Sequence, residues 1–215
     1  MADATLARLG SLAERRWGLV TTAQAEQVGV TRKQLSRMAA AGALERVARG
    51  VYRMAGAPTT RHEAIYATWL ALGGAMTTSA GVGVVAAGPT AAVVHGIGDF
   101  VLSDFDFIVP SRKGTRLPGL NLRARALTRQ EVIPVDGLPS LTVERTIADL
   151  VDLGTDLSLV AGAVRDAVRS DRLVAPDQLV RYLSSVAGRR KSTGMALAAE
   201  LFELAGVRPE GWRGD

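Results

Sequence analysis

Residues 19–54 read LVTTAQAEQVGVTRKQLSRMAAAGALERVARGVYRM, and this stretch decides the fold of the N-terminal part of the chain. A threonine, a good helix N-cap, precedes each of two segments with helical composition, at about 23–28 and 32–41. Gly29 stands between them, where the end of the first helix needs a residue that tolerates the left-handed conformation. Two short helices joined by a tight turn containing glycine predict a helix-turn-helix.

The second of these helices is expected to carry one apolar and one basic face. Leu35 and Met38 lie three residues apart and can pack together, whereas the opposite side carries Arg32, Lys33, Ser36 and Arg37. Lys33 and Arg37 would repel each other in an isolated helix, by a few tenths of a kcal/mol. Facing phosphates and guanine edges, the same pair would be favourable.

A basic hairpin is predicted directly after this helix. LERV and VYRM are apolar at alternate positions and are separated by Ala48-Arg49-Gly50, a pattern typical of a β-hairpin. Arg46, Arg49 and Arg53 make the hairpin basic, as the wing of a winged helix would be. A small helical domain with a solvated basic face is the alternative that this pattern leaves open.

The charge distribution favours nucleic-acid binding by this N-terminal segment. Residues 1–60 contain nine Lys/Arg and four Asp/Glu, so 9 − 4 gives a net charge of +5. The rest of the chain holds 26 − 9 = 17 basic and 21 − 4 = 17 acidic residues, which cancel. All the excess positive charge therefore lies on the predicted winged helix.

Several classes of protein are disfavoured by the composition. The chain has no cysteine, and its two histidines, His62 and His95, are far apart, so neither a disulfide nor a metal site nor a cofactor is expected. The N-terminus lacks the features of a secretory signal. Residues 64–98 carry no Asp, Glu, Lys or Arg, but their many glycines and threonines argue against a membrane span. We therefore expect a cytoplasmic protein without membrane contact.

The sequence predicts an α+β protein of two domains. Ala55-Gly56-Ala57-Pro58 is the first good linker, so the expected division is a winged helix-turn-helix at 1–56 and a mixed α/β domain at 57–215. Within the second domain we expect a helix near 79–87, strands between 100 and 135, and a helical part from about residue 142.

A run of basic residues in the second domain could be a phosphate-binding or partner-binding surface, or a solvated loop. Before the next acid, Glu131, the run contains Arg112, Lys113, Arg116, Arg123, Arg125 and Arg129. Nearby, Asp104 and Asp106 form a D-x-D pair of the kind that holds Mg²⁺ in nucleotidyltransferases, since residues i and i+2 of a strand face the same way. The serine-containing turn that such enzymes use is absent upstream, so catalysis is not the favoured interpretation.

The chain resembles the AbiEi-type antitoxins of bacterial type IV toxin–antitoxin systems. The resemblance is carried by the helix-turn-helix stretch and by three further segments in the family's order: SAGVGVVAAG at 79–88, DFDFIVPSRKGTRLPGLNLRARAL at 104–127 and VDGLPSLTVERTIADL at 135–150. The family implies a non-enzymatic antitoxin that represses its own operon by binding inverted repeats in the promoter. It also implies a second domain that counters a nucleotidyltransferase-like toxin, directly or indirectly.

Carried over by position, the family's DNA-reading role falls on the recognition helix and the wing. The residues concerned are Thr31, Arg32, Lys33, Gln34, Ser36, Arg37, Arg46, Arg49 and Arg53. Two other functions stay open from the sequence: a solitary winged-helix regulator whose second domain senses a ligand or dimerises, and a nucleotidyltransferase using Asp104 and Asp106. The oligomeric state is also open, a monomer in solution included.

Overall fold

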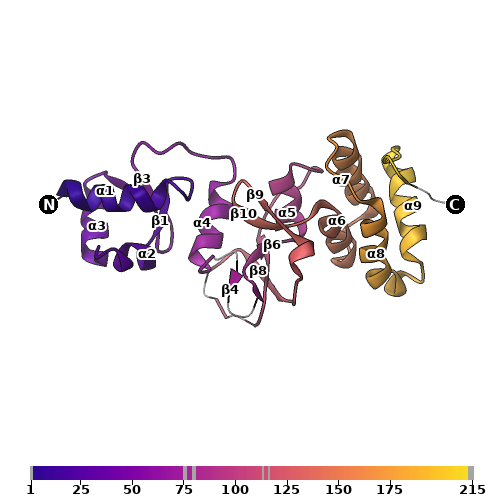
Figure 1. Ribbon diagram of the computed structural model, residues 1–215, viewed down its shortest axis with the longest axis horizontal. Coiled ribbons are helices and arrows are strands. Elements are labelled where there is room, and N and C mark those ends of the chain that lie inside the picture. The colour runs from indigo at the N-terminus through magenta and orange to yellow at the C-terminus, as the bar shows by residue number, and fades with distance from the viewer. Residues whose placement is uncertain (1, 75–76, 79–80, 113, 116, 213–215) are drawn as a thin grey trace. The chain divides into compact units, whose positions relative to one another are not determined.

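The computed structural model describes residues 2–74, 77–78, 81–112, 114–115 and 117–212 (Figure 1). The chain divides into two compact units. Unit 1 comprises Met1–Ala75 with Thr115–Leu117, and unit 2 comprises Met76–Gly114 with Pro118–Asp215. This division differs from the expected boundary after residue 56, because a further helix, α4, packs within unit 1.

Unit 1 has the element order of a winged helix followed by an additional helix. Its elements are α1 (Ala2–Ala13), β1 (Leu19–Thr21), α2 (Thr22–Gln27), α3 (Arg32–Ala40), β2 (Leu44–Ala48), β3 (Val51–Met54) and α4 (Glu63–Ala71). The three strands form an antiparallel sheet in the order β1-β3-β2. The predicted helix-turn-helix and hairpin are thereby confirmed.

Local sequence signals explain where the two short helices begin and how they are joined. Thr21 and Gln24 form a capping box at the start of α2, and Thr31 and Gln34 form a second one at the start of α3. Between the helices, Gly29 has a φ of +78°, a conformation that costs other residues energy. The turn is therefore set by side chains that are close together in the sequence.

The core of unit 1 joins every element of the winged helix. The buried side chains are Leu9, Val20, Ala25, Val30, Leu35 and Leu44, with Leu12, Val28, Met38 and Tyr52 among those packed around them. The first helix, α1, contacts β1 and β3. Burial of these apolar side chains fixes α3 by its Leu35 side and leaves its other side in solvent.

Helix α4 is attached to the wing by aromatic and ionic contacts. Trp17, which precedes β1, stacks on Tyr66 of α4 with ring centroids 3.9 Å apart. Trp17 and Trp69 form a T-shaped pair with ring centroids 6.2 Å apart. Arg53 of β3 donates a hydrogen bond to Glu63 at the start of α4, over 3.0 Å. These contacts across the expected linker explain why the unit extends beyond residue 56.

Unit 2 contains a mixed sheet and a group of helices. The elements before the final helices are β4 (Thr77–Thr78), β5 (Gly81–Val82), β6 (Val85–Ala86), α5 (Gly88–His95), β7 (Phe105–Val109), β8 (Leu120–Ala124), a 3₁₀ turn (Arg129–Glu131), β9 (Val132–Val135) and β10 (Leu138–Leu141). Five strands pair in the order β8-β7-β6-β10-β9, with β7/β8 and β6/β10 parallel and the other two pairs antiparallel.

The helix expected near 79–87 was placed wrongly. Residues 79 and 80 lie outside the described residues, and the following positions form β5 and β6. The helix of this region, α5, starts at Gly88 with Pro89 in its first turn, a position that tolerates proline. The small residues of this segment are compatible with a helix. Residues 85–86 instead form a strand, because β6 pairs with β7 and β10.

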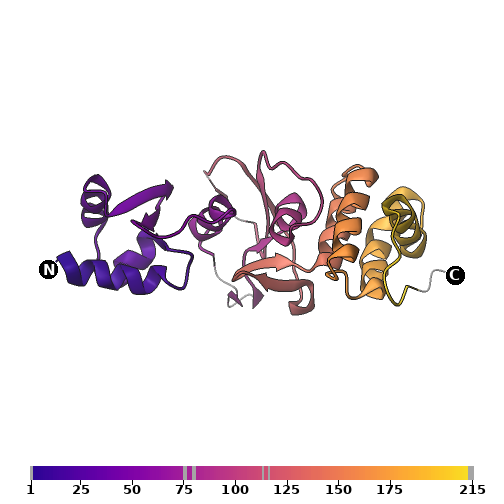
Figure 2. The ribbon, with the colours of Figure 1, turned by 90° about the horizontal axis from the view of Figure 1, so that it is seen from above.

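The C-terminal part of unit 2 is helical from Val143 onward, as the sequence predicts. Its elements are α6 (Val143–Asp152), α7 (Leu157–Arg169), α8 (Pro176–Ala187), a 3₁₀ turn (Gly188–Arg190) and α9 (Gly194–Ala205). Thr142 caps helix α6. The four helices are grouped toward the C-terminal end of the chain (Figure 2) and share one apolar core. Across the described part of the chain, no helix has both the length and the apolar character needed to cross a bilayer.

Candidate nucleic-acid interface

Helix α3 exposes the basic face that the sequence predicts. Leu35 is fully buried beneath it, whereas Arg32, Lys33, Ser36 and Arg37 are all exposed. The helix is nine residues long and its first turn is free of acidic residues. The exposed side therefore offers cationic and hydroxyl groups to a ligand that carries negative charge.

Two of the nine predicted DNA-binding residues are engaged at the start of α3. The Thr31 Oγ1 accepts a hydrogen bond from the Gln34 backbone N–H at 3.3 Å, and the Gln34 Oε1 accepts one from the Thr31 backbone N–H at 2.8 Å. These bonds satisfy helix-end groups that would otherwise need water or a ligand. Thr31 and Gln34 thus hold the first turn of α3 in place.

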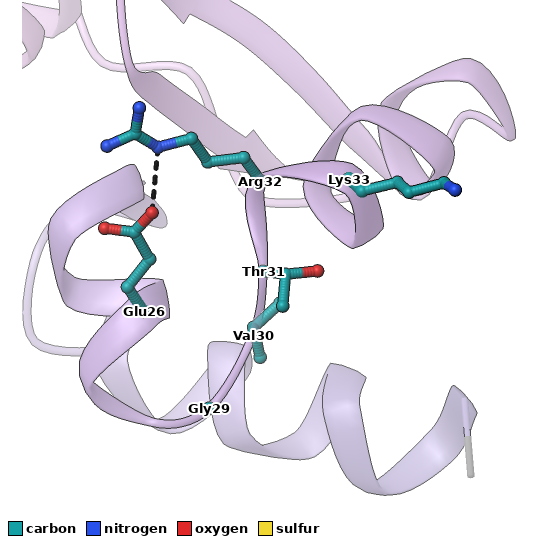
Figure 3. A pocket seen from close by; sticks show the side chains of 6 residues that line it. All are labelled: Glu26, Gly29, Val30, Thr31, Arg32 and Lys33. Atoms are coloured by element: carbon teal, nitrogen blue, oxygen red, sulfur yellow. Dashed lines mark hydrogen bonds and ion pairs between the residues drawn. The ribbon is translucent and has the colours of Figure 1, made fainter.

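Arg32 makes an ion pair across the turn of the helix-turn-helix. Its Nε donates to the Glu26 Oε1 at 2.8 Å, and both side chains are substantially exposed. Figure 3 shows this contact at the edge of a hollow of about 400 Å³, which is lined by Glu26, Gly29, Val30, Thr31, Arg32 and Lys33. Arg32 and Lys33 leave the helix in different directions in this view.

The wing presents two of its three arginines to solvent. Arg46 and Arg49 are exposed, and Gly50 closes the turn beside Arg49 with a φ of +74°. Arg53 instead lies between Glu45 and Glu63 and forms ion pairs with both. Its charge is therefore compensated within unit 1, so its position suits a structural contact better than a phosphate contact.

The predicted basic surface of the second domain is not a continuous cationic patch. Arg123 is paired with Asp149, and Arg125 lies 3.6 Å from Asp152 and 4.0 Å from Asp149. Arg112 is exposed, whereas Lys113 and Arg116 lie outside the described residues. The expectation that Arg123 and Arg125 offer free charge to a partner is therefore corrected, since acids of α6 balance both.

The D-x-D pair is divided between two environments. Asp104 is exposed, but Asp106 is buried on β7, where its backbone N–H donates to the Thr90 Oγ1 at 2.7 Å. Burial raises the pKa of Asp106, and the nearby Arg123 opposes this rise. Among the described residues no group of three or more His, Cys, Asp or Glu side chains could hold a metal ion.

Sequence reasoning missed two acids that organise these sites. Glu26 lies six residues before its partner Arg32, and Asp149 lies 26 residues after Arg123. The partners of each pair belong to different elements, α2 and α3 in the first and β8 and α6 in the second, so only the folded chain brings them together. The nearest signal was the absence of any other acid between Glu14 and Glu45, which singles out Glu26 in the helix-turn-helix.

The fold and the exposed residues of unit 1 define a winged helix-turn-helix of the DNA-binding kind. Residues 8–55 match the family described as "Transcriptional regulator, AbiEi antitoxin". The match confirms the AbiEi resemblance over this segment and indicates a regulator domain of the antitoxin type.

A longer structural likeness extends over most of the chain. The crystal structure of the RV2827C protein from Mycobacterium tuberculosis aligns with a TM-score of 0.57 and 17% sequence identity, covering 95% of this chain and 78% of that one. At this identity the likeness concerns the fold alone. No curated protein matches the chain.

Proposed function

We propose that this protein is a non-enzymatic antitoxin that represses its own operon and acts in the cytoplasm. The observation that carries the proposal is the exposed basic face of α3, in a winged helix that matches the AbiEi regulator family. The concentration of all net positive charge in residues 1–60 supports the same function.

In this proposal α3 enters the major groove and the wing contacts the adjacent backbone. Lys33, Arg37 and the terminal nitrogens of Arg32 are the candidates for base or phosphate contacts on α3, and Arg46 and Arg49 are those on the wing. Inverted repeats in the promoter would be bound by two copies of the chain, one on each half-site.

Unit 2 is proposed to counter a nucleotidyltransferase-like toxin encoded beside this chain. Nucleotidyl transfer by unit 2 is not the favoured function, because the two carboxylates of the D-x-D pair lie in different environments, with Asp104 exposed and Asp106 buried on β7. A solitary regulator is the alternative if the adjacent gene encodes no toxin.

The DNA-binding part is tested by replacing Lys33 and Arg37 together with alanine. Loss of the two cations should weaken binding to the protein's own promoter by about tenfold or more, since one base-reading arginine is worth about 1–3 kcal/mol. Affinity is measured by fluorescence anisotropy at fixed ionic strength. A double alanine variant of Arg169 and Arg181, two exposed arginines of unit 2, removes the same charge elsewhere and should leave affinity unchanged.

Equal affinity of the wild type and the Lys33/Arg37 variant would contradict the assignment of α3 as the reading helix. The antitoxin part is tested separately, by co-expression with the neighbouring gene product in cells. Failure of the intact protein to restore growth would leave the solitary regulator as the better function.

A further inference from the structure

We propose that Glu26 is a positioning residue for sequence recognition, which holds Arg32 so that its two terminal nitrogens face the DNA. This inference rests on the proposed DNA-binding function and assigns a role to an acid that lies beside the basic side chains of α3. The ligand of Arg32 would be a guanine base in the half-site of double-stranded DNA.

The geometry of the pair leaves the recognition end of Arg32 available. Glu26 accepts a hydrogen bond from Nε only, at 2.8 Å, and no described residue accepts one from the terminal nitrogens of Arg32. Those two nitrogens can still donate side by side to the O6 and N7 atoms of guanine. The guanidinium points away from α3 on the side of Glu26 (Figure 3).

This arrangement places an acid close to the DNA surface, and a purely structural role is a poor explanation for it. An ion pair between exposed side chains contributes little to stability, and here the Arg32 side chain is 79% exposed and that of Glu26 is 42% exposed. A carboxylate near the start of α3 also weakens attraction to phosphates. The ion pair offsets this weaker attraction to phosphates if it holds Arg32 in its binding conformation, because less conformational entropy is then lost on binding.

The alternative role of Glu26 is competition, in which its carboxylate and the DNA compete for the guanidinium of Arg32. The two functions make opposite predictions for the removal of Glu26. Competition predicts stronger sequence preference in a Glu26→Ala variant, whereas positioning predicts weaker preference. Both predict some gain of non-specific affinity, because one negative charge is removed, so the ratio of specific to non-specific affinity is the quantity to measure.

The experiment uses full-length protein and a DNA site selected from a library of random duplexes by the wild type. Affinities for the selected site and for a scrambled duplex are measured at one salt concentration for wild type, Glu26→Ala and Glu26→Gln. In Glu26→Gln the side-chain amide oxygen can still accept a hydrogen bond from the Arg32 Nε, so this variant separates position from charge. Glu14→Ala is the matched control, since Glu14 is an exposed acid of the same unit.

We expect Glu26→Ala to lower the affinity ratio about five- to a hundredfold, the range for one misplaced base contact. Glu26→Gln and Glu14→Ala should keep the wild-type ratio, and all variants should keep the wild-type unfolding temperature. In an Arg32→Ala background the Glu26→Ala effect should vanish, because the partner through which Glu26 acts is gone.

Three results would overturn the inference: an unchanged ratio in Glu26→Ala, a raised ratio in that variant, or an equal loss in the Arg32→Ala background. A library from which wild-type protein enriches no sequence is a different failure. It would count against the proposed DNA-reading function itself and not against Glu26 alone.

Discussion

At the scale of single residues, Asp149 is a buried acid of unit 2 that contacts several elements at once. Its side chain is fully buried in α6, and its Oδ2 accepts a hydrogen bond from the backbone N–H of Gly88 at 2.9 Å. Its Oδ1 accepts from a terminal nitrogen of Arg123 at 2.8 Å. One carboxylate thus joins the start of α5, the strand β8 and the helix α6.

Replacement of Asp149 by asparagine should destabilise unit 2 by about 3 kcal/mol, because it leaves the partly buried Arg123 without its counter-charge. The free energy of unfolding in urea measures this effect. Asp104→Asn is the matched control, since Asp104 is an exposed acid of the same sheet region and should change stability by less than about 0.5 kcal/mol. Equal stability of the two variants would contradict the role assigned to Asp149.

His95 is expected to make stability depend on pH. Burial lowers the pKa of His95 below its ordinary value of 6.5, although the ring Nε2 lies 2.7 Å from the Leu141 carbonyl oxygen. In the pH range between the two pKa values the unfolded state binds more protons than the folded state, so stability falls as the pH is lowered below 6.5. Above this pH both states are neutral at this site and the effect is absent.

The measurement compares unfolding free energies of wild type and His95→Gln from about pH 5 to pH 8, the range in which histidine titrates. The wild type should lose up to about 1.4 kcal/mol per pH unit more than the variant as the solution is acidified. Contributions of other groups, His62 included, are common to both proteins and cancel in the difference. If the unfolding free energies of the two proteins change with pH in parallel, the pKa of His95 is the same in the folded and unfolded states.

At the scale of elements, α4 should act as a stabilising part of the winged-helix unit. A fragment ending at Gly74 keeps the stacking of Trp17 on Tyr66, whereas a fragment ending at Gly56 exposes Trp17. Aromatic pairs contribute about 1 kcal/mol beyond their buried area, so the longer fragment should unfold at the higher temperature. Circular dichroism measures the unfolding temperatures, and Trp17 fluorescence should shift to the red in the shorter fragment.

A point variant separates the aromatic contact from mere chain length. In the longer fragment, Tyr66→Ala should lower the unfolding temperature, whereas Thr59→Ala, at an exposed position, should leave it unchanged. If the two fragments unfold at the same temperature, α4 does not stabilise unit 1. The domain boundary would then lie at the linker 55–58.

The elements that could be predicted from the sequence are those whose signals are local. The caps at Thr31 and Thr142, the turn at Gly29 and the hairpin each involve residues within a few positions of one another. The sheet of unit 2 could not be derived in the same way, because β6 has two residues and pairs with strands far along the chain. The same reason hid the Arg123–Asp149 pair, and with it the loss of a free basic surface.

At the scale of the whole molecule, DNA binding and toxin neutralisation should be separable. Arg123 and Arg125 of the predicted basic run are ion-paired, so the prediction of a partner surface now concerns Arg112, Lys113 and Arg116. Replacing these three by glutamate should leave promoter affinity unchanged and reduce protection of cells that express the toxin. Arg169, Arg181 and Arg208, which are exposed elsewhere in unit 2, provide a control with the same charge change.

A loss of promoter affinity with intact protection would assign this surface to DNA binding. Unchanged affinity together with unchanged protection would identify a solvated loop. The first result would contradict the division of labour between DNA binding and toxin neutralisation, whereas the second would contradict only the role proposed for these three residues.

The strand pairing has a consequence for folding during synthesis on the ribosome. The sheet of unit 1 is complete once Met54 has been made, since β1 and β2 both pair with β3. The sheet of unit 2 stays incomplete until Ser140 is available to pair beside Ala86, because β10 joins β9 to β6. Because a nascent chain emerges from its N-terminus and long-range pairing forms slowly, the winged helix should fold during synthesis, while the remainder of the chain is still being translated.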